Sequence, residues 1–271
     1  MVKYSRLRYE YKDELEWIRI MDTYPENHRY LYFEDSVQGI LNLRDATVPA
    51  LEYVGVMAEG ARCFVAEPDR VLIGGLGSCA LLHRLEHWWA GRAEILTVEA
   101  NPKILELGRR FFRLHPRSRV FLGDYRNKLD EIPEQSLDLC LTDCYSAVAI
   151  PAHLLSVEYV GLIWRGLKEG GAAVFNYWNP DCNHIVGDQV RTLVEVFSEV
   201  GFVKCIDDEN LVVFCRKQGS GPRPTEVVFK SRVYPIQPIV LASMSKWPAF
   251  MKGCQVIRDD NVSRLIQAIG I

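Results

Sequence analysis

The 271-residue sequence lacks a long apolar run, an excess of charge of one sign and an internal repeat. No segment approaches the roughly 20 apolar residues that span a bilayer. The first 21 residues have neither the apolar core nor the small-residue cleavage site of a secretory signal. The 32 Lys and Arg are scattered among 35 Asp and Glu and leave a formal net charge of −3. These absences predict a cytoplasmic protein with no membrane or nucleic-acid partner.

Paired metal-binding cysteines are also lacking, because the eight cysteines are spread through the chain without a C-x-x-C motif. Cys140 and Cys215 lie in the apolar runs LDLCLTD and LVVFC, where a reduced thiol packs like a small hydrophobic side chain. The segment His83–His87 matches the H-x-x-E-H pattern of some zinc proteases, but leucine and tryptophan residues that must pack on a sheet are interleaved with it. We therefore expect buried thiols and no metal site.

The pattern of apolar residues divides the chain into three regions. In residues 1–58 the run RYLYFEDSVQGILNL alternates apolar and polar residues around a turn-like Glu-Asp-Ser, which predicts a β-hairpin. Residues 59–217 alternate short apolar runs with segments of helical spacing, which predicts parallel β-α-β units. Residues 218–271, in which GSGPRP follows Gln218, form a C-terminal extension of unknown role, with a strand-like TEVVFK and a short helix over 261–269.

The strand-like runs of the middle region end differently from the way they begin. The last two runs, FVKCIDD and LVVFCRK, are separated by only a short turn. A parallel pair needs a longer crossover connection, so these two strands should pair antiparallel. The sequence predicts a mostly parallel sheet that closes with one antiparallel strand.

A glycine-rich loop, Gly74–Ser78, lies between the first strand and the first helix of this region. Glycine permits a sharp turn and the close approach of a ligand, and the start of the helix offers free N–H groups. Glu99 ends the next strand, where a carboxylate accepts hydrogen bonds from the two hydroxyls of a ribose. Asp124 ends the third strand, and we expect it to bind an adenine amino group. The sequence therefore predicts a nucleoside site.

Two ligand classes fit this loop, in which Gly74, Gly75 and Gly77 are the candidate nucleoside contacts. The range 75–80 satisfies the relaxed dinucleotide fingerprint, in which the last glycine is replaced by alanine, so NAD is one alternative. The antiparallel end of the sheet and the lack of a second mononucleotide-binding half favour nucleosides of the S-adenosylmethionine type.

The sequence resembles the spermidine synthase family, the polyamine aminopropyltransferases, over roughly residues 28–216. The motifs that carry the resemblance are DSVQ, VLIGGLGS, ILTVEANPKILELGRRFF, RVFLGD, LDLCLTDCYSA and LKEGGAAVFNYW. It implies an α/β fold with an N-terminal β-hairpin region and a Rossmann-like, seven-stranded class I methyltransferase sheet. It further implies that Gln38 and the loop glycines contact the nucleoside and that Glu99 holds the ribose. By the same resemblance, Asp143 in the fourth-strand loop helps to deprotonate the attacking amine.

The chemistry of such a transfer also suits Asp143. Attack on a carbon beside a sulfonium needs a neutral amine, whose free pKa lies near that of Lys, so a neighbouring carboxylate can orient the amine and accept its proton. Asp143 follows LCLT at a strand end, and we place Tyr145 with it as a catalytic candidate. Tyr53, Tyr177 and Trp178 are the candidate substrate contacts, because aromatic faces hold a sulfonium or an ammonium by cation–π contact.

The chain departs from the family where its members carry acids that bind a diamine. Arg44, Asp45 and Gly55 stand in the stretch where the family has such acids, and the range 144–147 reads CYSA in place of a second aspartate. A doubly charged diamine would find fewer carboxylates. We therefore expect the acceptor, the donor, or both to differ from putrescine and decarboxylated S-adenosylmethionine. S-adenosylmethionine itself is one alternative donor, with Arg44 as the candidate partner of its carboxylate.

The expected function is a transferase that moves an aminopropyl or 3-amino-3-carboxypropyl group from (decarboxylated) S-adenosylmethionine to a small-molecule amine. The amine is external or, by ring closure, the donor's own, and 5′-methylthioadenosine is released without a metal. A methyltransferase that releases S-adenosylhomocysteine is the first alternative, and a degenerate nucleoside-binding or scaffold protein is the second. The resemblance also implies a homodimer.

Overall fold

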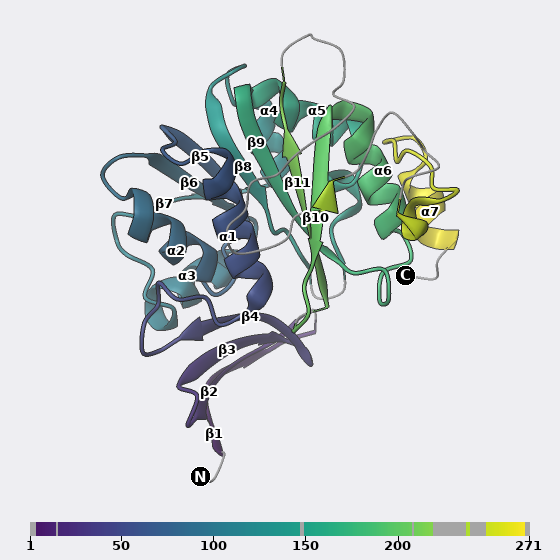
Figure 1. The fold of residues 1–271 in the computed structure, drawn as a ribbon. Coiled ribbons are helices and arrows are strands. Elements are labelled where there is room, and N and C mark those ends of the chain that lie inside the picture. Colours follow the sequence, from purple (N-terminus) through teal and green to yellow (C-terminus); the bar gives the residue numbers. More distant parts are fainter. Residues whose placement is uncertain are drawn as a thin grey trace.

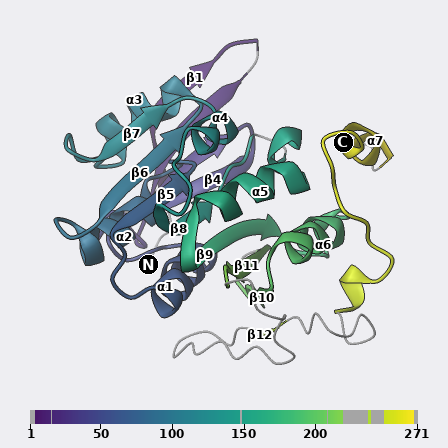
Figure 2. The same cartoon turned by 90° about the horizontal axis from the view of Figure 1, so that it is seen from above.

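The computed structural model describes residues 4–14, 16–146, 149–207, 209–218, 237–238 and 248–268. Within these ranges the chain forms a small antiparallel sheet and a larger mixed sheet with helices on both faces (Figures 1 and 2). The small sheet lies beyond one end of the larger sheet, at the bottom of Figure 1. The two meet closely, since a Cβ added to Gly39 of the small sheet would lie 2.6 Å from the Ser78 hydroxyl.

The small sheet has four antiparallel strands, two more than the predicted hairpin. They are β1 (Tyr4–Lys12), β2 (Trp17–Tyr24), β3 (His28–Phe33) and β4 (Ser36–Asn42). The predicted hairpin is formed by β3 and β4 around Glu34 and Asp35. Ile18 and Ile20 lie on the same face of β2 and are fully buried in the core that the sheet shares with the helices. This burial stabilises β2 as a third strand beside the hairpin.

An ion pair inside the small sheet also joins it to the rest of the molecule. The Arg29 guanidinium donates to both carboxylate oxygens of Asp22, at 2.6 and 2.8 Å. It also donates to the carbonyl of Phe111, at 2.7 Å, at the end of helix α3 (Pro102–Phe111). This bidentate pair is largely buried, so it fixes the position of the sheet on the helix layer.

The larger sheet has seven main strands in the order β10-β11-β9-β8-β5-β6-β7, and the two-residue strand β12 (Gln237–Pro238) pairs with β10. The main strands are β5 (Arg70–Gly74), β6 (Glu94–Glu99), β7 (Arg119–Leu122), β8 (Leu137–Thr142), β9 (Leu167–Trp178), β10 (Glu199–Lys204) and β11 (Asn210–Arg216). Strands β5 to β9 pair in parallel, and β11 runs antiparallel between β9 and β10. The predicted mostly parallel sheet with an antiparallel last strand is confirmed.

Helices cover both faces of this sheet (Figure 2). One buried cluster contains α1 (Glu52–Phe64), α2 (Ala80–Trp89) and α3, and the other contains α4 (Tyr125–Asp130), α5 (Val157–Gly166) and α6 (Val186–Val196). Successive residues of β9 alternate between the clusters, since Val174 packs with α1 and Phe175 with α5 and α6. Every helix in the described ranges is too short or too polar to cross a membrane.

Helix α1 begins before position 58, the predicted region boundary, and packs on β9 and β11 of the larger sheet. The contact is close at Gly60, where an added Cβ would lie 2.0 Å from the ring of Phe214. The absence of a side chain at this position lets the helix approach the sheet. As a result, the first turn of α1, with Tyr53, reaches the carboxyl end of β8.

The described part of the C-terminal extension packs against α5 and α6. It contains the 3-10 turn η3 (Ala249–Met251) and α7 (Val262–Ala268), and the predicted strand over 225–230 lies outside the described residues. The N–H of Gln255 donates to Asp188 at 2.6 Å, and Arg126 makes a bidentate pair with Asp259 at 2.8 and 2.6 Å. These contacts hold the extension beside the loop that precedes α5.

A pair of glycine substitutions tests this packing. An added Cβ at Gly187 of α6 would lie 2.2 Å from the Phe250 carbonyl oxygen, whereas a Cβ at Gly161 of α5 would meet nothing within 4 Å. We expect Gly187→Ala to lower the free energy of unfolding by about 1–3 kcal/mol. Gly161→Ala should raise it by up to about 1 kcal/mol through helix propensity. Urea denaturation measures both, and equal effects would contradict the docking of the extension on α6.

Candidate active site

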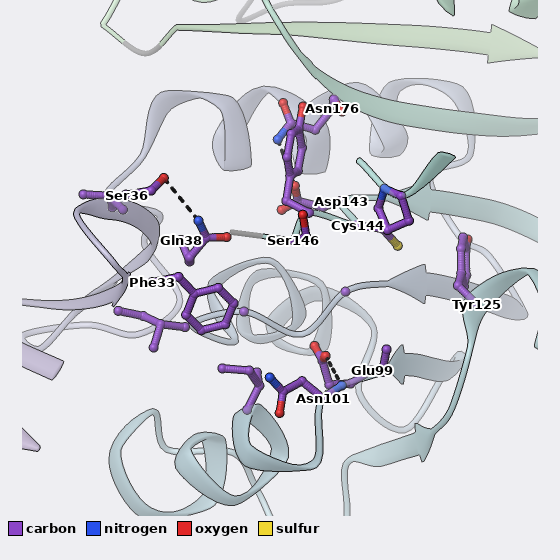
Figure 3. A pocket seen from close by; sticks show the side chains of 18 of the residues that line it. Phe33, Ser36, Gln38, Glu99, Asn101, Tyr125, Asp143, Cys144, Ser146 and Asn176 are labelled. Atoms are coloured by element: carbon purple, nitrogen blue, oxygen red, sulfur yellow. Dashed lines mark hydrogen bonds between the residues drawn. The ribbon is translucent and has the colours of Figure 1, made fainter. Parts of the chain in front are cut away.

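A cavity of about 1360 Å³ opens where the carboxyl ends of the parallel strands face the small sheet. Its walls come from the loops after β5, β6, β7 and β8, from the end of β9, from the turn between β10 and β11, and from the small sheet. Figure 3 shows Gln38, Glu99, Asp143 and Asn176 around this hollow. Pockets for one small ligand commonly measure about 300–1,000 Å³. The cavity is therefore large enough for a nucleoside together with a second reactant.

The glycine loop lies on the floor of the cavity in a backbone conformation that requires glycine. Gly75 has a φ of +92°, and an added Cβ would lie 2.1 Å from the carbonyl oxygen of Asp143. Gly77 has a φ of +48° and a free approach on its Cα side, with only the Gln38 carbonyl at 3.5 Å. Both glycines line the cavity, and the loop backbone is open to a ligand, while their contact with a nucleoside stays a prediction.

Gly74 has a different place from the one predicted. It is not among the residues that line the cavity. A Cβ at this position would point into the protein interior. A Cβ there would lie 2.6 Å from the Tyr125 ring and 2.7 Å from the Cys144 sulfur. Gly74 therefore allows these two side chains to pack under the loop, and the nucleoside contact predicted for it is corrected to a packing role.

Glu99 lies at the end of β6 with both carboxylate oxygens held by backbone N–H groups. Oε2 accepts from Leu76 at 3.0 Å and Oε1 accepts from Asn101 at 2.8 Å. Burial raises the pKa of the Glu99 carboxyl, and these N–H groups act in the opposite direction. The carboxylate lines the cavity and keeps free lone pairs for two hydroxyl donors.

Asp124 also lines the cavity, but its carboxylate already makes hydrogen bonds within the protein. Its Oδ1 accepts the N–H of Asn127 at 2.8 Å and so caps α4, while its Oδ2 lies 2.7 Å from His153 Nε2. Burial acts to raise the pKa of Asp124, but the hydrogen bonds from Asn127 and His153 outweigh it and lower the pKa. An adenine amino group would have to share this carboxylate with His153.

Asp143, directly after β8, has a hydrogen-bond donor on each carboxylate oxygen. Asn176 Nδ2 donates to Oδ1 at 2.8 Å, and the Tyr53 hydroxyl donates to Oδ2 at 3.2 Å. Burial raises the pKa of the Asp143 carboxyl, and the two hydrogen bonds oppose this rise. The arrangement holds a carboxylate in one orientation at the cavity wall, with lone pairs left to accept a proton.

Two of the predicted aromatic residues complete this wall, and a third does not. Tyr145 stacks on Trp178 with ring centroids 5.3 Å apart, and both line the cavity. Tyr177 instead stacks on Phe175 in the buried cluster under α5 and α6. Adjacent strand residues point to opposite faces, so Tyr177 and Trp178 cannot both face the cavity. The substrate contact predicted for Tyr177 is therefore wrong.

The predictions for the hairpin divide in the same way. Gln38 of β4 lines the cavity, and its Nε2 donates to the Ser36 hydroxyl at 3.2 Å (Figure 3). Arg44 donates to the Pro25 carbonyl at 3.0 Å and is not among the cavity-lining residues. The predicted contact of Arg44 with a donor carboxylate thus has no basis in this arrangement.

Sequence reasoning missed most of the acids that the fold collects. The cavity is lined by Glu16, Glu34, Glu99, Glu106, Asp124, Asp143, Asp207 and Glu209. Among the described lining residues the basic side chains are Lys103, paired with Glu106 at 2.8 Å, and His153, paired with Asp124. The acidic run at 207–209 was a usable signal, because it follows β10, which runs in the same direction as β9 and so ends at the carboxyl edge of the parallel strands.

A metal-binding group of side chains is not present in the described part of the chain, where no three His, Cys, Asp or Glu residues are suitably grouped. Within the H-x-x-E-H segment, His83 Nε2 lies 2.7 Å from the Phe112 carbonyl oxygen. That ring therefore has a backbone partner inside the protein.

Comparison with curated proteins finds distant relatives, and no protein-family model matches. An uncharacterized protein of Methanocaldococcus jannaschii is 29% identical over 119 residues, which are 41% of this chain and 40% of that protein. A polyamine aminopropyltransferase of Vibrio vulnificus is 28% identical over 140 residues, which are 50% of this chain and 46% of that protein. The matched region thus spans less than half the length of these curated relatives.

Solved structures are similar over more of the chain. A probable spermidine synthase of Corynebacterium glutamicum superposes with a TM-score of 0.74 at 18% identity, covering 92% of this chain and 95% of that one. Spermidine synthase of Thermotoga maritima gives 0.62 at 17% identity, covering 78% and 73%. Human methyltransferase-like protein 13 gives 0.56 at 18% identity, covering 65% and 86%. The chain has the fold of spermidine synthases, which is also the fold of class I methyltransferases, and this confirms the predicted fold.

Two glycine variants test the geometry of the loop. Gly75→Ala should lower the free energy of unfolding by at least about 3 kcal/mol, because the new Cβ meets a backbone oxygen and φ is strained. In Gly77→Ala the new Cβ has room, so only the strain of a left-handed backbone at alanine remains. This variant should lower the free energy of unfolding by about 1–2 kcal/mol. Urea denaturation gives both values. Equal losses would contradict the close approach of Gly75 to Asp143.

Proposed function

We propose that this protein transfers an aminopropyl group from decarboxylated S-adenosylmethionine to a small-molecule amine and releases 5′-methylthioadenosine. The observation that carries the proposal is the Asp143 carboxylate, oriented by Tyr53 and Asn176 in the cavity that the glycine loop and Glu99 also line. The aminopropyltransferase activity of the Vibrio vulnificus relative and the spermidine synthases of the same fold support it.

The nucleoside half of the donor fits the wall formed by the loops after β5 and β6. The backbone at Gly75 and Gly77 is open for close contact, and Glu99 accepts hydrogen bonds from the two ribose hydroxyls. Gln38 reaches the same space from the hairpin. The adenine amino group would donate to Asp124, which keeps a lone pair on each oxygen beside its existing partners.

The acceptor amine reacts at Asp143. Its nitrogen attacks the carbon next to the sulfonium, the carbon–nitrogen bond forms, and the carbon–sulfur electron pair returns to sulfur as a neutral thioether. Before this attack the amine must lose the proton of its ammonium form, and that proton passes to Asp143, whose raised pKa makes it a better acceptor near neutral pH. Since the sulfonium is already a good leaving group, in-line positioning of the two reactants supplies most of the rate increase. Tyr145 and Trp178 offer aromatic faces to the cationic groups.

The charge of the cavity favours the decarboxylated donor over S-adenosylmethionine. The carboxylate of S-adenosylmethionine would enter a space with eight lining carboxyl groups. The basic side chains among the described lining residues, Lys103 and His153, are already paired with acids. The same field attracts an acceptor with a second ammonium group, for which Asp207 and Glu209 are the available acids. These acids stand in for those that the family carries elsewhere.

The first experiment identifies the nucleoside product. With a diamine present, we expect decarboxylated S-adenosylmethionine to be turned over to methylthioadenosine with a kcat/KM at least about tenfold above that for S-adenosylmethionine, as electrostatics in the cavity require. Chromatography of the nucleosides provides the measurement. Release of S-adenosylhomocysteine would instead show a methyltransferase, and absence of turnover with every amine would favour a binding protein.

A single substitution tests the role of Asp143. Asp143→Asn keeps the shape of the side chain but cannot accept a proton, so kcat should fall by about 10²–10⁴-fold. The affinity for methylthioadenosine, measured by calorimetry, should change by less than about threefold, since Asp143 acts on the amine. Asp181→Asn, at an exposed carboxylate paired with Lys204, serves as the matched control. Equal losses of turnover and nucleoside affinity in Asp143→Asn would sink the assignment.

A further inference from the structure

The side chain of Asn176 has two different hydrogen-bonding ends, and each meets a different partner. Its Nδ2 donates to Asp143 at 2.8 Å, and its Oδ1 accepts from Nδ2 of Asn210, also at 2.8 Å. Asn176 is 3% exposed and Asn210 is 9% exposed, so water has little access to replace either bond. We call the chain Asn210–Asn176–Asp143 the amide relay.

The strand order brings the three residues of the amide relay together. Val212 of β11 lies opposite Asn176 of β9, so Asn210 is the diagonal neighbour of Asn176 on the same face. Strand β9 in turn pairs with β8 and ends its ladder with Thr142 beside Phe175. Asp143 follows Thr142 and Asn176 follows Phe175, so the amide lies beside the carboxylate.

We propose that Asn210 is a positioning residue for Asp143, because its donated hydrogen bond holds the Asn176 amide with the nitrogen toward the carboxylate. The significance for catalysis rests on the proposed function of Asp143 as the proton acceptor. An asparagine amide can present its oxygen or its nitrogen by a half turn of the side chain. With the oxygen toward Asp143, the amide would repel the ionised carboxylate. Asn210 opposes that turn because its own N–H group needs the Asn176 oxygen.

The groups around Asp143 make this contact important for its charge. The titratable side chains near its carboxyl or on the same cavity wall are Tyr53 of α1, Cys144 and Tyr145 of its own loop, and Glu99, Asp207 and Glu209. Burial raises the pKa of Cys144 and Tyr145, so both are neutral at pH 7. None of these groups is a cation. The ionised form of Asp143 therefore depends on the hydrogen bonds from Tyr53 and Asn176.

The test replaces the Asn210 donor by an acceptor of the same size. In Asn210→Asp the Asn176 amide lies between two carboxyl groups and can turn its nitrogen to only one, so the pair retains a proton to higher pH. We expect the titration of Asp143 to move up by at least about one pH unit. NMR of protein labelled at the aspartate carboxyl carbons follows it, with the signal assigned through Asp143→Asn. The acid limb of the kcat profile should move in the same direction.

Two further variants make the result specific. Asn179→Asp adds a carboxylate just after β9. One of its oxygens can still accept the hydrogen bond that the N–H of Asp181 now donates to Asn179 Oδ1. This variant should leave the titration of Asp143 unmoved. Asn210→Ser is neutral and too short to reach Asn176, so it serves if Asn210→Asp does not fold. It should lower kcat by about tenfold while the KM for the nucleoside donor changes by less than about threefold.

The outcomes separate the positioning role from the proposed function. Equal shifts in Asn210→Asp and Asn179→Asp would reveal a general effect of added charge and overturn the role of Asn210. An unmoved Asp143 titration in Asn210→Asp, with kcat unchanged in Asn210→Ser, would overturn it as well. A titration that moves in a protein without amine-transfer activity would support the positioning of Asp143 and reject the proposed function.

Discussion

The hydrogen bonds to the Asp143 carboxylate tie the site to the whole fold. A carboxylate removed from water is costly unless donors compensate it, and its donors here come from α1 and β9. Tyr53 reaches Asp143 only because α1 lies close to the sheet, which the missing side chain of Gly60 beside Phe214 allows. Core packing and the orientation of the carboxylate are therefore one constraint. A change that lifts α1 from the sheet also removes a donor from the site.

A second close contact couples the two halves of the cavity. The Asp143 N–H donates to the Gly74 carbonyl at 2.9 Å, and the Asp143 carbonyl lies against the Cα of Gly75. The glycine loop and Asp143, to which the proposed function assigns the nucleoside and the amine, thus share backbone contacts. Transfer between two bound molecules depends on the angle and distance at which they meet. Backbone contact is a rigid way to set both, because no rotatable side chain intervenes.

Local patterns in the sequence predict the parts of the fold and site that depend on neighbouring residues. The buried strands, the glycine loop and Glu99 are of this kind, because each follows from a short run and its position at a strand end. Because side chains alternate along a strand, the sequence also indicates that Trp178 lies on the same face as Asn176. It likewise indicates that Tyr177 lies on the opposite face, away from the cavity. Helix α1 was not predicted, since glycines within EYVGVMAEGARCF weaken its helical signal.

Contacts between distant residues could not be predicted in this way. Tyr53 and Asp143 are 90 residues apart, and their bond exists only because α1 and β8 share the same end of the sheet. The net charge of −3 likewise gives no hint that eight carboxyl groups line one cavity, because it averages over the whole chain, in which 32 Lys and Arg nearly balance 35 Asp and Glu. The inference that few acids would face a diamine came from motif positions, which do not report the acids that other elements bring to the cavity wall.

The acidic cavity also bears on how the proposed reaction proceeds after bond formation. In the proposed transfer the cationic sulfonium becomes a neutral thioether, so the nucleoside product leaves uncharged, while the amine product carries the additional amino group of the donor. A cavity lined by carboxylates attracts the charged donor more strongly than the neutral nucleoside that replaces it. The electrostatic attraction that would favour a cationic donor is therefore lost for the neutral nucleoside product once the carbon–sulfur bond has broken. In the proposed reaction the lengthened amine would keep its attraction to Asp207 and Glu209 and would therefore leave more slowly than the nucleoside.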